Sequence, residues 1–374
     1  MLHLTGHPSC PSSLHGDVSS RLVESQLKQD TPYYPWFDWL RGVLAIAVML
    51  KHDGLIPWEH GGNFAVQVFF ALSGWLIGGI LIHLKPADLP RFYFNRAVRI
   101  WIPYYIAFGL LIAASLLRDP VTAKWLEIVF YKLSFVYNLF GTQQLANHVA
   151  EMPLRGTGSH FWSVNAEEQF YLLAPLLLVL VRGEWARGVA VWTLIAVVAW
   201  VSHTYASIVF GVLAAVAVHR YGEFHLNRLV QAALIVILLG ATAGLIAKLE
   251  YNLMAPIVSI AIVLLLAQRG EQNRIGAIFG GMSYQLYLNH WIGFFIAHAV
   301  FKPFGMRDSV AAHVLSFCLN VSLAVAMYWY IDRRMLAARG SLFTQARGQL
   351  FVKLAYGMVA IGCAVGLALM AARL

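Results

Sequence analysis

Several ionisable side chains lie in the first long apolar segment of the chain. Asp38, Arg41, Lys51, His52 and Asp53 all occur there, and only nine apolar or small residues separate Arg41 from Lys51. In a helix, a separation of eleven residues brings Arg41 and His52 onto one face, about 16 Å apart along the axis. Asp38 lies one turn before Arg41 and can pair with it. A shared polar face predicts a functional cavity, whereas charged residues at the two ends of a short helix are the structural alternative.

The apolar helix predicted to begin near residue 161 opens with two adjacent carboxylates, Glu167 and Glu168. Residues four apart share a helix face, so Ser163, Glu167 and Tyr171 are predicted to lie together, with Glu168 pointing elsewhere. Acidic residues at an ordinary helix N-terminus would explain part of this pattern, because they interact favourably with the helix dipole.

Arg96 and Arg99 are three residues apart in the segment 91–103 and share a helical face. Two guanidinium groups held together suit a polyphosphate or an anionic head group. Anchoring of a membrane helix at its cytoplasmic end would also place arginines here.

Tyr287 and His290 are one helical turn apart within the long apolar segment 278–301. An imidazole in such a place is either a hydrogen-bonded core residue or part of a functional site. The residues alone leave both interpretations open.

The elements that must hold these groups are membrane helices. Of the 374 residues, 59% are hydrophobic and 12% are charged, and the mean hydropathy is +0.65. A soluble domain of this length could not bury so much apolar surface in one core. The apolar runs are long and do not alternate with polar residues, which favours helices over strands.

We therefore predict an all-α, polytopic transmembrane helical bundle of about ten core helices plus one extra C-terminal helix. A span needs about 20 mostly apolar residues. The segment 125–140 is predicted to be an interfacial or re-entrant helix. Spans are expected near 36–57, 64–84, 100–118, 161–181, 188–203, 205–219, 228–248, 253–268, 278–301, 309–331 and 350–372.

The lysines and arginines predict the orientation of this bundle. They cluster in the loops 85–99 and 333–353, which places both loops and the N-terminus in the cytoplasm. Residues 1–35 are predicted to be a disordered cytoplasmic arm without a cleaved signal peptide. Residues 36–335 then form the main transmembrane domain, and 336–374 a basic cytoplasmic loop followed by the additional helix.

Charge and cysteine content exclude two other classes of function. The net charge of +9 follows from the basic loops of a membrane protein, so no nucleic-acid partner is predicted. Cys10, Cys318 and Cys363 lie far apart and lack metal-ligand spacing. We therefore expect neither a metal nor a disulfide framework.

Taken in order, these segments resemble the acyltransferase-3 family of bacterial membrane proteins. The family pattern begins with an arginine, ten further residues and a histidine, here Arg41 through His52. Each motif is weak alone, but five in the correct order over about residues 37–335 are specific. The later motifs are Phe-Phe-x-Leu-Ser-Gly, Arg-x-x-Arg-Ile-x-x-Pro, Trp-Ser-x-x-x-Glu-Glu-Gln-Phe-Tyr and Ser-Tyr-x-x-Tyr-Leu-x-His, at 69–74, 96–103, 162–171 and 283–290.

The resemblance implies an O-acyltransferase in the bacterial inner (cytoplasmic) membrane, in contact with lipid. Its donor would be cytoplasmic acyl-CoA, most simply acetyl-CoA, used without a metal. Its acceptor would be a hydroxyl of a cell-envelope or exported carbohydrate, such as a lipid-linked polysaccharide repeat. The sequence does not indicate the oligomeric state.

A mechanism can be written as a hypothesis on these residues. Arg96 and Arg99 would bind the phosphates of coenzyme A, and His52 would act as general base on the acceptor hydroxyl. Arg41 would bind the donor or stabilise charge on the thioester oxygen, and Glu167 would bind the sugar or orient His52. A covalent acyl-histidine is an alternative to direct transfer. The predicted substrate-binding residues are Asp38, Ser73, Ser163, Tyr171 and His290.

Two other classes of protein remain possible from the sequence. Ionisable groups within the membrane are also typical of transporters of polar solutes, although no repeat of matching halves is visible here. A scaffold or lipid-binding subunit is a third class, and it gives the shared face of Arg41 and His52 no purpose. Consumption of acyl-CoA separates the enzyme from both alternatives.

Overall fold

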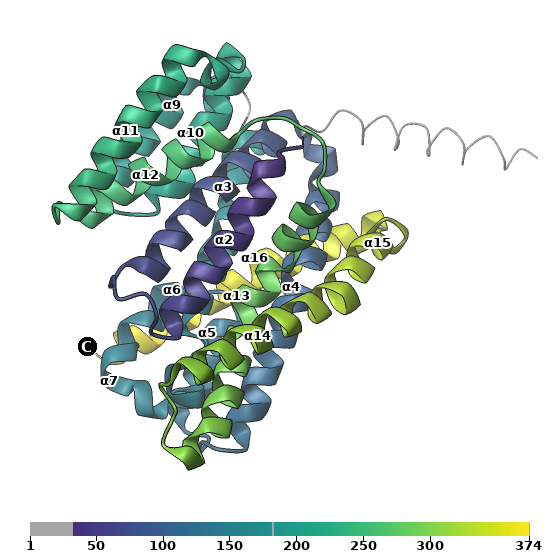
Figure 1. Ribbon diagram of the computed structural model, residues 1–374. Helices are drawn as coiled ribbons and strands as arrows, with labels where there is room; N and C mark the ends of the chain where they lie inside the picture. Colours follow the sequence, from purple (N-terminus) through teal and green to yellow (C-terminus); the bar gives the residue numbers. More distant parts are fainter. Residues whose placement is uncertain (1–32, 182, 374) are drawn as a thin grey trace, which may run out of the picture.

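The computed structural model describes residues 33–181 and 183–373, and within these ranges the chain is all-α. Thirteen of the described α-helices are longer than four residues, and no strand occurs among the described residues. The predicted fold class is therefore confirmed (Figure 1). Nearly all of the arm predicted over 1–35 lies outside the described residues.

The helices follow the predicted spans closely, and their bounds are these. The first are α2 (Pro35–His52), α3 (Gly61–His83), α4 (Leu89–Leu116), α5 (Ala123–Leu133), α6 (Tyr137–Phe140), α7 (Leu145–His148) and α8 (Trp162–Pro175). They are followed by α9 (Val189–Val201), α10 (Ala206–Tyr221), α11 (Arg228–Ile246), α12 (Tyr251–Leu266), α13 (Arg274–Phe301), α14 (Val310–Met327), α15 (Arg333–Leu342) and α16 (Gln345–Ala371).

The segment 125–140, which we expected to be one helix, is divided. Helix α5 ends at Leu133 and α6 begins at Tyr137. Between them Phe135 has a positive φ of 56°, a backbone conformation that interrupts a right-handed helix. The remainder of 119–160 consists of short helical turns, among the residues described, and contains no full crossing.

Five helical segments are long and apolar enough to cross a membrane: Gly61–His83, Pro86–Leu116, Arg228–Ile246, Val310–Leu342 and Gln345–Ala371. Helices α9, α10 and α12 are shorter but apolar. Helices α2 and α13 fall outside both groups, because they carry the ionisable and amide side chains of the candidate site. Their composition reflects the site that they position.

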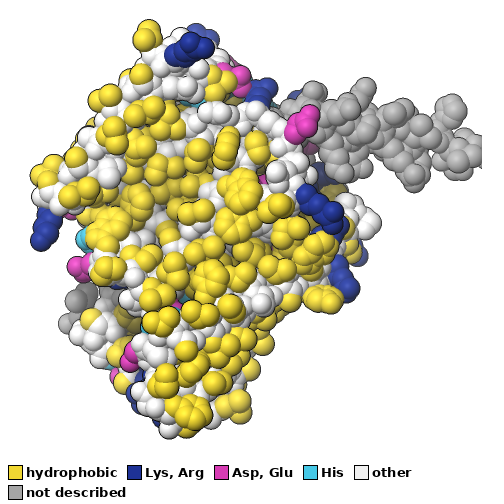
Figure 2. Space-filling model, in the orientation of Figure 1, with side chains coloured by type: hydrophobic (Ala, Val, Ile, Leu, Met, Phe, Trp, Pro, Cys, Tyr) yellow, Lys and Arg dark blue, Asp and Glu magenta, His cyan; other side chains and the backbone are white. Residues whose placement is uncertain are grey.

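Hydrophobic side chains cover most of the face drawn in Figure 2, and charged side chains lie mainly at its margins. Large apolar residues such as Leu229, Leu239 and Ile246 on α11 are exposed. Soluble monomers rarely expose contiguous apolar patches of more than a few hundred Å². This surface is the one expected of a protein surrounded by lipid.

The helices form two groups that meet along α3. Helices α9 to α12 lie together at one edge of the molecule (Figure 1), and α10 and α12 both pack on α3. On its other side α3 packs against α2, which in turn packs against α13. Helix α16 lies along α4. Helices α2, α3, α4, α8 and α13 supply the polar residues of the candidate site.

The contact between α3 and α10 depends on small residues. A Cβ atom built on Gly74 would lie 2.0 Å from the carbonyl oxygen of Ile208, and one on Gly211 would lie 2.2 Å from that of Ala71. Small residues allow membrane helices to approach this closely. The neighbouring Ser73 donates a hydrogen bond of 2.7 Å to Glu167 Oε1, so the close crossing also helps to fix the site.

We predict that Gly74→Ala destabilises the protein, because the new methyl group must displace the backbone of α10. Such overpacking costs about 1–3 kcal/mol. Gly79→Ala is the matched control, since nothing lies within 4 Å of a Cβ on that residue of the same helix. The midpoint of thermal unfolding in detergent should fall for Gly74→Ala and stay unchanged or rise for Gly79→Ala. Equal midpoints would contradict the close packing of α3 on α10.

Candidate active site

Two separate cavities lie at opposite ends of α2 and follow one another along α13. We call the first the inner cavity, and it has a volume of about 510 Å³. Residues from the first turns of α2 and from the first half of α13 line part of it. Eight of the ten predicted site residues line it, and His52 and His290 do not. The eight are Asp38, Arg41, Ser73, Arg96, Arg99, Ser163, Glu167 and Tyr171.

Arg41 is held at the wall of the inner cavity by a carboxylate. Its Nη1 donates to Asp38 Oδ1 at 2.9 Å, the pairing that the three-residue spacing predicted. The Tyr33 hydroxyl donates to the other carboxylate oxygen of Asp38. A guanidinium has five N–H donors, so this pairing orients Arg41 and leaves donors for a ligand.

Arg96 and Arg99 bring two more positive charges to the same cavity. The Arg96 guanidinium lies over the rings of Tyr171, at 5.8 Å from the centroid, and Phe92, at 5.9 Å. Within the described part of the chain, no carboxylate lies within 4 Å of either arginine. Aromatic contacts orient a guanidinium without neutralising it, so both charges are available to an anionic ligand.

Glu167 is fixed by two hydroxyl groups. Its Oε1 accepts from Ser73 at 2.7 Å and its Oε2 accepts from Tyr171 at 3.1 Å. Glu168 points away from this cavity, as the helical spacing predicted, and accepts from Trp101 Nε1 at 2.7 Å. Both oxygens of Glu167 already have partners, so its carboxylate holds the cavity wall together as well as facing a ligand.

Hydroxyl groups mark the far end of the inner cavity. Tyr287 donates to the carbonyl oxygen of His160 at 2.6 Å, and its oxygen lies 2.6 Å from Ser163 Oγ. A phenol has only one proton to donate. Ser163 is therefore the donor to Tyr287, and the two hydroxyls form a layer between this cavity and the next.

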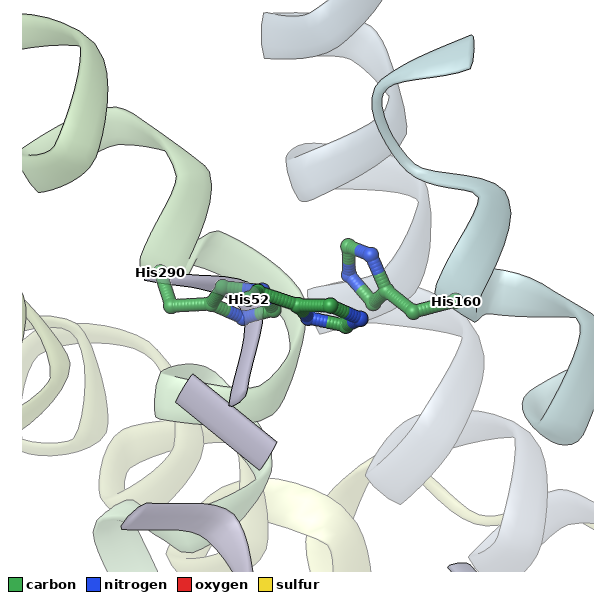
Figure 3. Close-up of side chains that lie close together, drawn as sticks. All are labelled: His52, His160 and His290. Carbon is green, nitrogen blue, oxygen red and sulfur yellow. The ribbon is translucent and has the colours of Figure 1, made fainter. Parts of the chain in front are cut away.

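Beyond this layer three histidines from three separate segments come together (Figure 3). His52 is the last residue of α2, His160 precedes α8, and His290 lies in the middle of α13. His52 Nδ1 lies 2.8 Å from His290 Nε2, and their rings stack with centroids 4.9 Å apart. The His160 ring centroid lies 5.6 Å from that of His52 and 4.6 Å from that of His290.

Backbone carbonyls determine the tautomers of this pair. His290 Nδ1 lies 2.9 Å from the carbonyl oxygen of Tyr287, which can only accept, so Nδ1 carries the proton. Nε2 of neutral His290 is then an acceptor, and His52 Nδ1 must donate to it. His52 Nε2 is left with a lone pair. An exposed imidazole with a free lone pair is equipped to accept a proton.

These histidines line a second cavity of about 160 Å³, the histidine cavity, together with Ser159, Trp291 and Phe294. The structure thus places the predicted base and the predicted phosphate-binding arginines in different cavities. Helix α2 runs from one cavity to the other over the eleven positions that separate Arg41 from His52. The same holds along α13, where Gly280 lines the inner cavity and His290 the histidine cavity.

The three histidines could also hold a metal ion, since one ring nitrogen of each lies within 4.8 Å of the others. Three protein ligands and an open fourth position are typical of catalytic zinc sites. Binding through His290 Nε2 would require the lone pair that accepts from His52 Nδ1, and so would remove the hydrogen bond between the two rings. The absence of a metal stays a prediction.

His160 is the residue of this group that sequence reasoning missed. It is buried, and its Nε2 has no hydrogen-bond partner among the described residues. The available signal was its position two residues before Trp162-Ser163, at the start of a recognised motif. A histidine in a loop lacks helical spacing, so nothing in the sequence related it to His52.

Comparison with known proteins identifies the family of this chain. An acyltransferase-3 model, described as an acyltransferase domain, matches residues 34–329. The chain belongs to the acyltransferase-3 family. All five motifs lie inside the matched region, and so do the inner cavity's arginines and the three histidines.

Two relatives with part of this sequence are O-acetyltransferases by name. The O-acetyltransferase OatA of Staphylococcus aureus (strain NCTC 8325 / PS 47) is 32% identical over 160 residues, 39% of this chain and 25% of the relative. The peptidoglycan O-acetyltransferase OatA of Listeria monocytogenes serovar 1/2a is 29% identical over 165 residues, 42% of this chain and 26% of the relative. The match thus spans about a quarter of each relative's length. No solved structure matched.

We predict that the two cavities open to opposite sides of the membrane. Gln272→Cys at the inner cavity and Ser159→Cys at the histidine cavity, each in a chain lacking Cys10, Cys318 and Cys363, place one thiol at each. A membrane-impermeant maleimide should label Ser159→Cys when it is added to spheroplasts. The same reagent should label Gln272→Cys when it is added to inverted membrane vesicles. Labelling of both from one side would contradict this topology.

Proposed function

We propose that the protein is a membrane-embedded O-acyltransferase that moves an acyl group from cytoplasmic acyl-CoA to a carbohydrate hydroxyl. The observation that carries this proposal is the separation of three arginines in one cavity from a histidine base in another. Its relatives' names favour acetyl as the acyl group and a cell-envelope glycan as the acceptor.

The inner cavity suits the donor. Arg96 and Arg99 have no carboxylate partner within 4 Å in the described chain, and guanidinium groups bind phosphate through strong, bidentate hydrogen bonds. We assign the phosphates of coenzyme A to this pair. Arg41 shares the cavity and is positioned by Asp38, so it can bind the donor or the developing negative charge on the thioester oxygen.

His52 suits the role of general base. In this proposal its Nε2 takes the proton of the acceptor hydroxyl while that oxygen forms a bond to the thioester carbon. The carbon–sulfur bond then breaks, and the thiolate of coenzyme A receives the proton from His52. His290 positions His52 through the 2.8 Å hydrogen bond, and its own orientation is fixed by the Tyr287 carbonyl.

The hydroxyl layer of Ser163 and Tyr287 is the place where donor and acceptor would meet. The thioester arm must extend along the inner cavity to this layer, because both hydroxyls line that cavity. On the other side of the layer stands His160, whose carbonyl oxygen accepts from Tyr287. We therefore propose that the acyl group passes from a cytoplasmic donor to an acceptor on the outer side of a bacterial inner membrane, in a protein whose N-terminus is cytoplasmic.

We predict that acetyl-CoA binds to the purified protein in nanodiscs. The double variant Arg96→Ala/Arg99→Ala should weaken this binding more than tenfold, because each lost charge-assisted hydrogen bond is worth about 1.5–3 kcal/mol. Isothermal titration calorimetry measures the dissociation constant. Arg118→Ala, on the loop after α4 and outside the cavity, is the control for lost charge. Equal binding by all three proteins would contradict the assigned donor site.

We predict that His52→Ala lowers the rate of thiol release from acetyl-CoA by about 10²–10⁴ while acetyl-CoA still binds. Release is followed with a thiol reagent, with and without a membrane extract as acceptor source, and with a chelator in parallel. Inhibition by the chelator, reversed by zinc, would replace the base mechanism with a metal mechanism. Absence of acyl-CoA binding and consumption by folded protein would instead favour a transporter.

His290 gives a test of the positioning role. Gln can supply an acceptor oxygen near the place of Nε2, whereas Phe has the shape of the ring without an acceptor. We predict that His290→Phe lowers kcat about tenfold to a hundredfold and raises KM little, and that His290→Gln restores most of kcat. Full activity in His290→Phe with a loss in His290→Gln would show that His290 acts only through packing, and an equal loss in both variants would contradict the acceptor role of Nε2.

A further inference from the structure

The structure contains a third cavity, the largest of the three. Most of the residues that line it lie outside the family motifs. It has a volume of about 950 Å³, and we call it the outer aromatic cavity. Three turns build it: the connection from α2 to α3, the turn from α9 to α10, and the turn from α11 to α12. A volume at the upper end of the usual range of about 300–1,000 Å³ accommodates a sizeable ligand.

Aromatic rings supply much of this lining. Trp58 is 40% exposed, and its ring centroid lies 6.3 Å from that of Tyr251. The rings of His60 and Tyr251 are stacked with centroids 4.0 Å apart. Deeper in the cavity Trp162 and Tyr205 both make edge contacts with Phe70. Such rings offer flat apolar faces next to polar edges.

Amide groups lie between these rings, and their orientation is fixed. Asn63 Oδ1 accepts from the Tyr251 hydroxyl at 2.7 Å and from Gln67 Nε2 at 3.4 Å. Ser207 donates to Gln67 Oε1 at 2.5 Å. The Nδ2 group of Asn63 keeps two N–H donors without a partner among the described residues. A ligand hydroxyl can accept from this group.

The backbone around the cavity is strained. His203, Tyr205 and Lys248 have φ values of 58°, 52° and 60°, and all three line it. They are half of the six non-glycine residues with positive φ in the described chain. Bulky side chains adopt this conformation only when the surrounding structure imposes it, and such residues cluster at functional sites.

Charge distinguishes this cavity from the inner one. Its lining contains Glu59, Glu250 and Lys248 but no arginine among the described residues, so it does not suit a phosphate. The combination of flat rings, oriented amides and carboxylates suits a ligand with apolar ring faces and many hydroxyls. Each sugar hydroxyl both donates and accepts, and the C–H face of a sugar ring packs on an aromatic ring.

The cavity adjoins the reacting groups through one short segment. His160 lines the histidine cavity, Trp162 the outer aromatic cavity and Ser163 the inner cavity. Phe70 lines both the inner cavity and the outer aromatic cavity. All three cavities therefore meet at residues 160–163, where the hydroxyl layer lies.

We propose that the outer aromatic cavity is the binding site for an uncharged glycan, which it holds by the rings of Trp58 and Tyr251 and the amide of Asn63. In doing so it presents the glycan to the transfer chemistry at residues 160–163. The role of this site in acyl transfer rests on the proposed function. The binding of a glycan at this site does not.

Saturation-transfer NMR on the nanodisc protein tests the assignment, with three trisaccharide probes: chitotriose, maltotriose and the anionic trigalacturonate. At least one uncharged probe should bind, and trigalacturonate should bind more weakly. Trp58→Ala and Tyr251→Ala should each raise the dissociation constant of the bound probe about tenfold, a loss of about 1.4 kcal/mol. Trp185→Ala and Tyr221→Ala are matched controls, because both residues are exposed and lie outside the cavity.

Acetyl-CoA binding is measured on the same samples. Glycan binding that depends on Trp58 and Tyr251, in a protein that does not bind acetyl-CoA, would support this site and contradict the proposed donor. Acetyl-CoA binding without saturable binding of any probe would overturn the site and leave the donor assignment in place. Equal glycan affinity in all four variants would also overturn it.

Discussion

Ionised side chains inside an apolar helical bundle must keep their hydrogen bonds, because an unpaired charge there has a large desolvation penalty. Asp38 is bonded by both Tyr33 and Arg41, and Glu167 is bonded by both Ser73 and Tyr171. The bonds of Asp38 stay at the start of α2, whereas Glu167 joins α8 to α3 through Ser73. The Ser73–Glu167 bond fixes α3 against α8 at the inner cavity, and the bonds of Asp38 fix the orientation of Arg41 beside them.

The same constraint explains why two helices of the site are poor membrane spans by composition. Helix α13 contains Gln285, Asn289 and His290, and all three are buried. Gln285 donates to Asp332 at 2.7 Å, and Asn289 donates back to Gln285. Protein surrounds these groups, so they do not face lipid. A bundle of this kind needs apolar helices outside and tolerates polar helices within.

Much of the fold and about half of the site geometry could be predicted from the sequence. Helical spacing was enough to place Arg41 beside Asp38 and Glu167 beside Tyr171, because these contacts are local. Contacts between distant segments were not accessible: no spacing relates His52 to His290, 238 residues later, or either of them to His160. The break at Phe135 was missed for another reason, since its positive φ is imposed by packing and not by a glycine.

The close crossing of α3 and α10 separates two tasks within one chain. The groups proposed to bind the donor lie on the helices α2, α4 and α8, whereas the rim of the outer aromatic cavity, proposed to bind a glycan, consists of turns, two of them in the α9–α12 group. Turns accept substitutions more readily than packed helices. Members of such a family could therefore acquire new acceptors by exchanging short turns while the acyl-transfer machinery is inherited unchanged, and acceptor preference could be transplanted by grafting those turns.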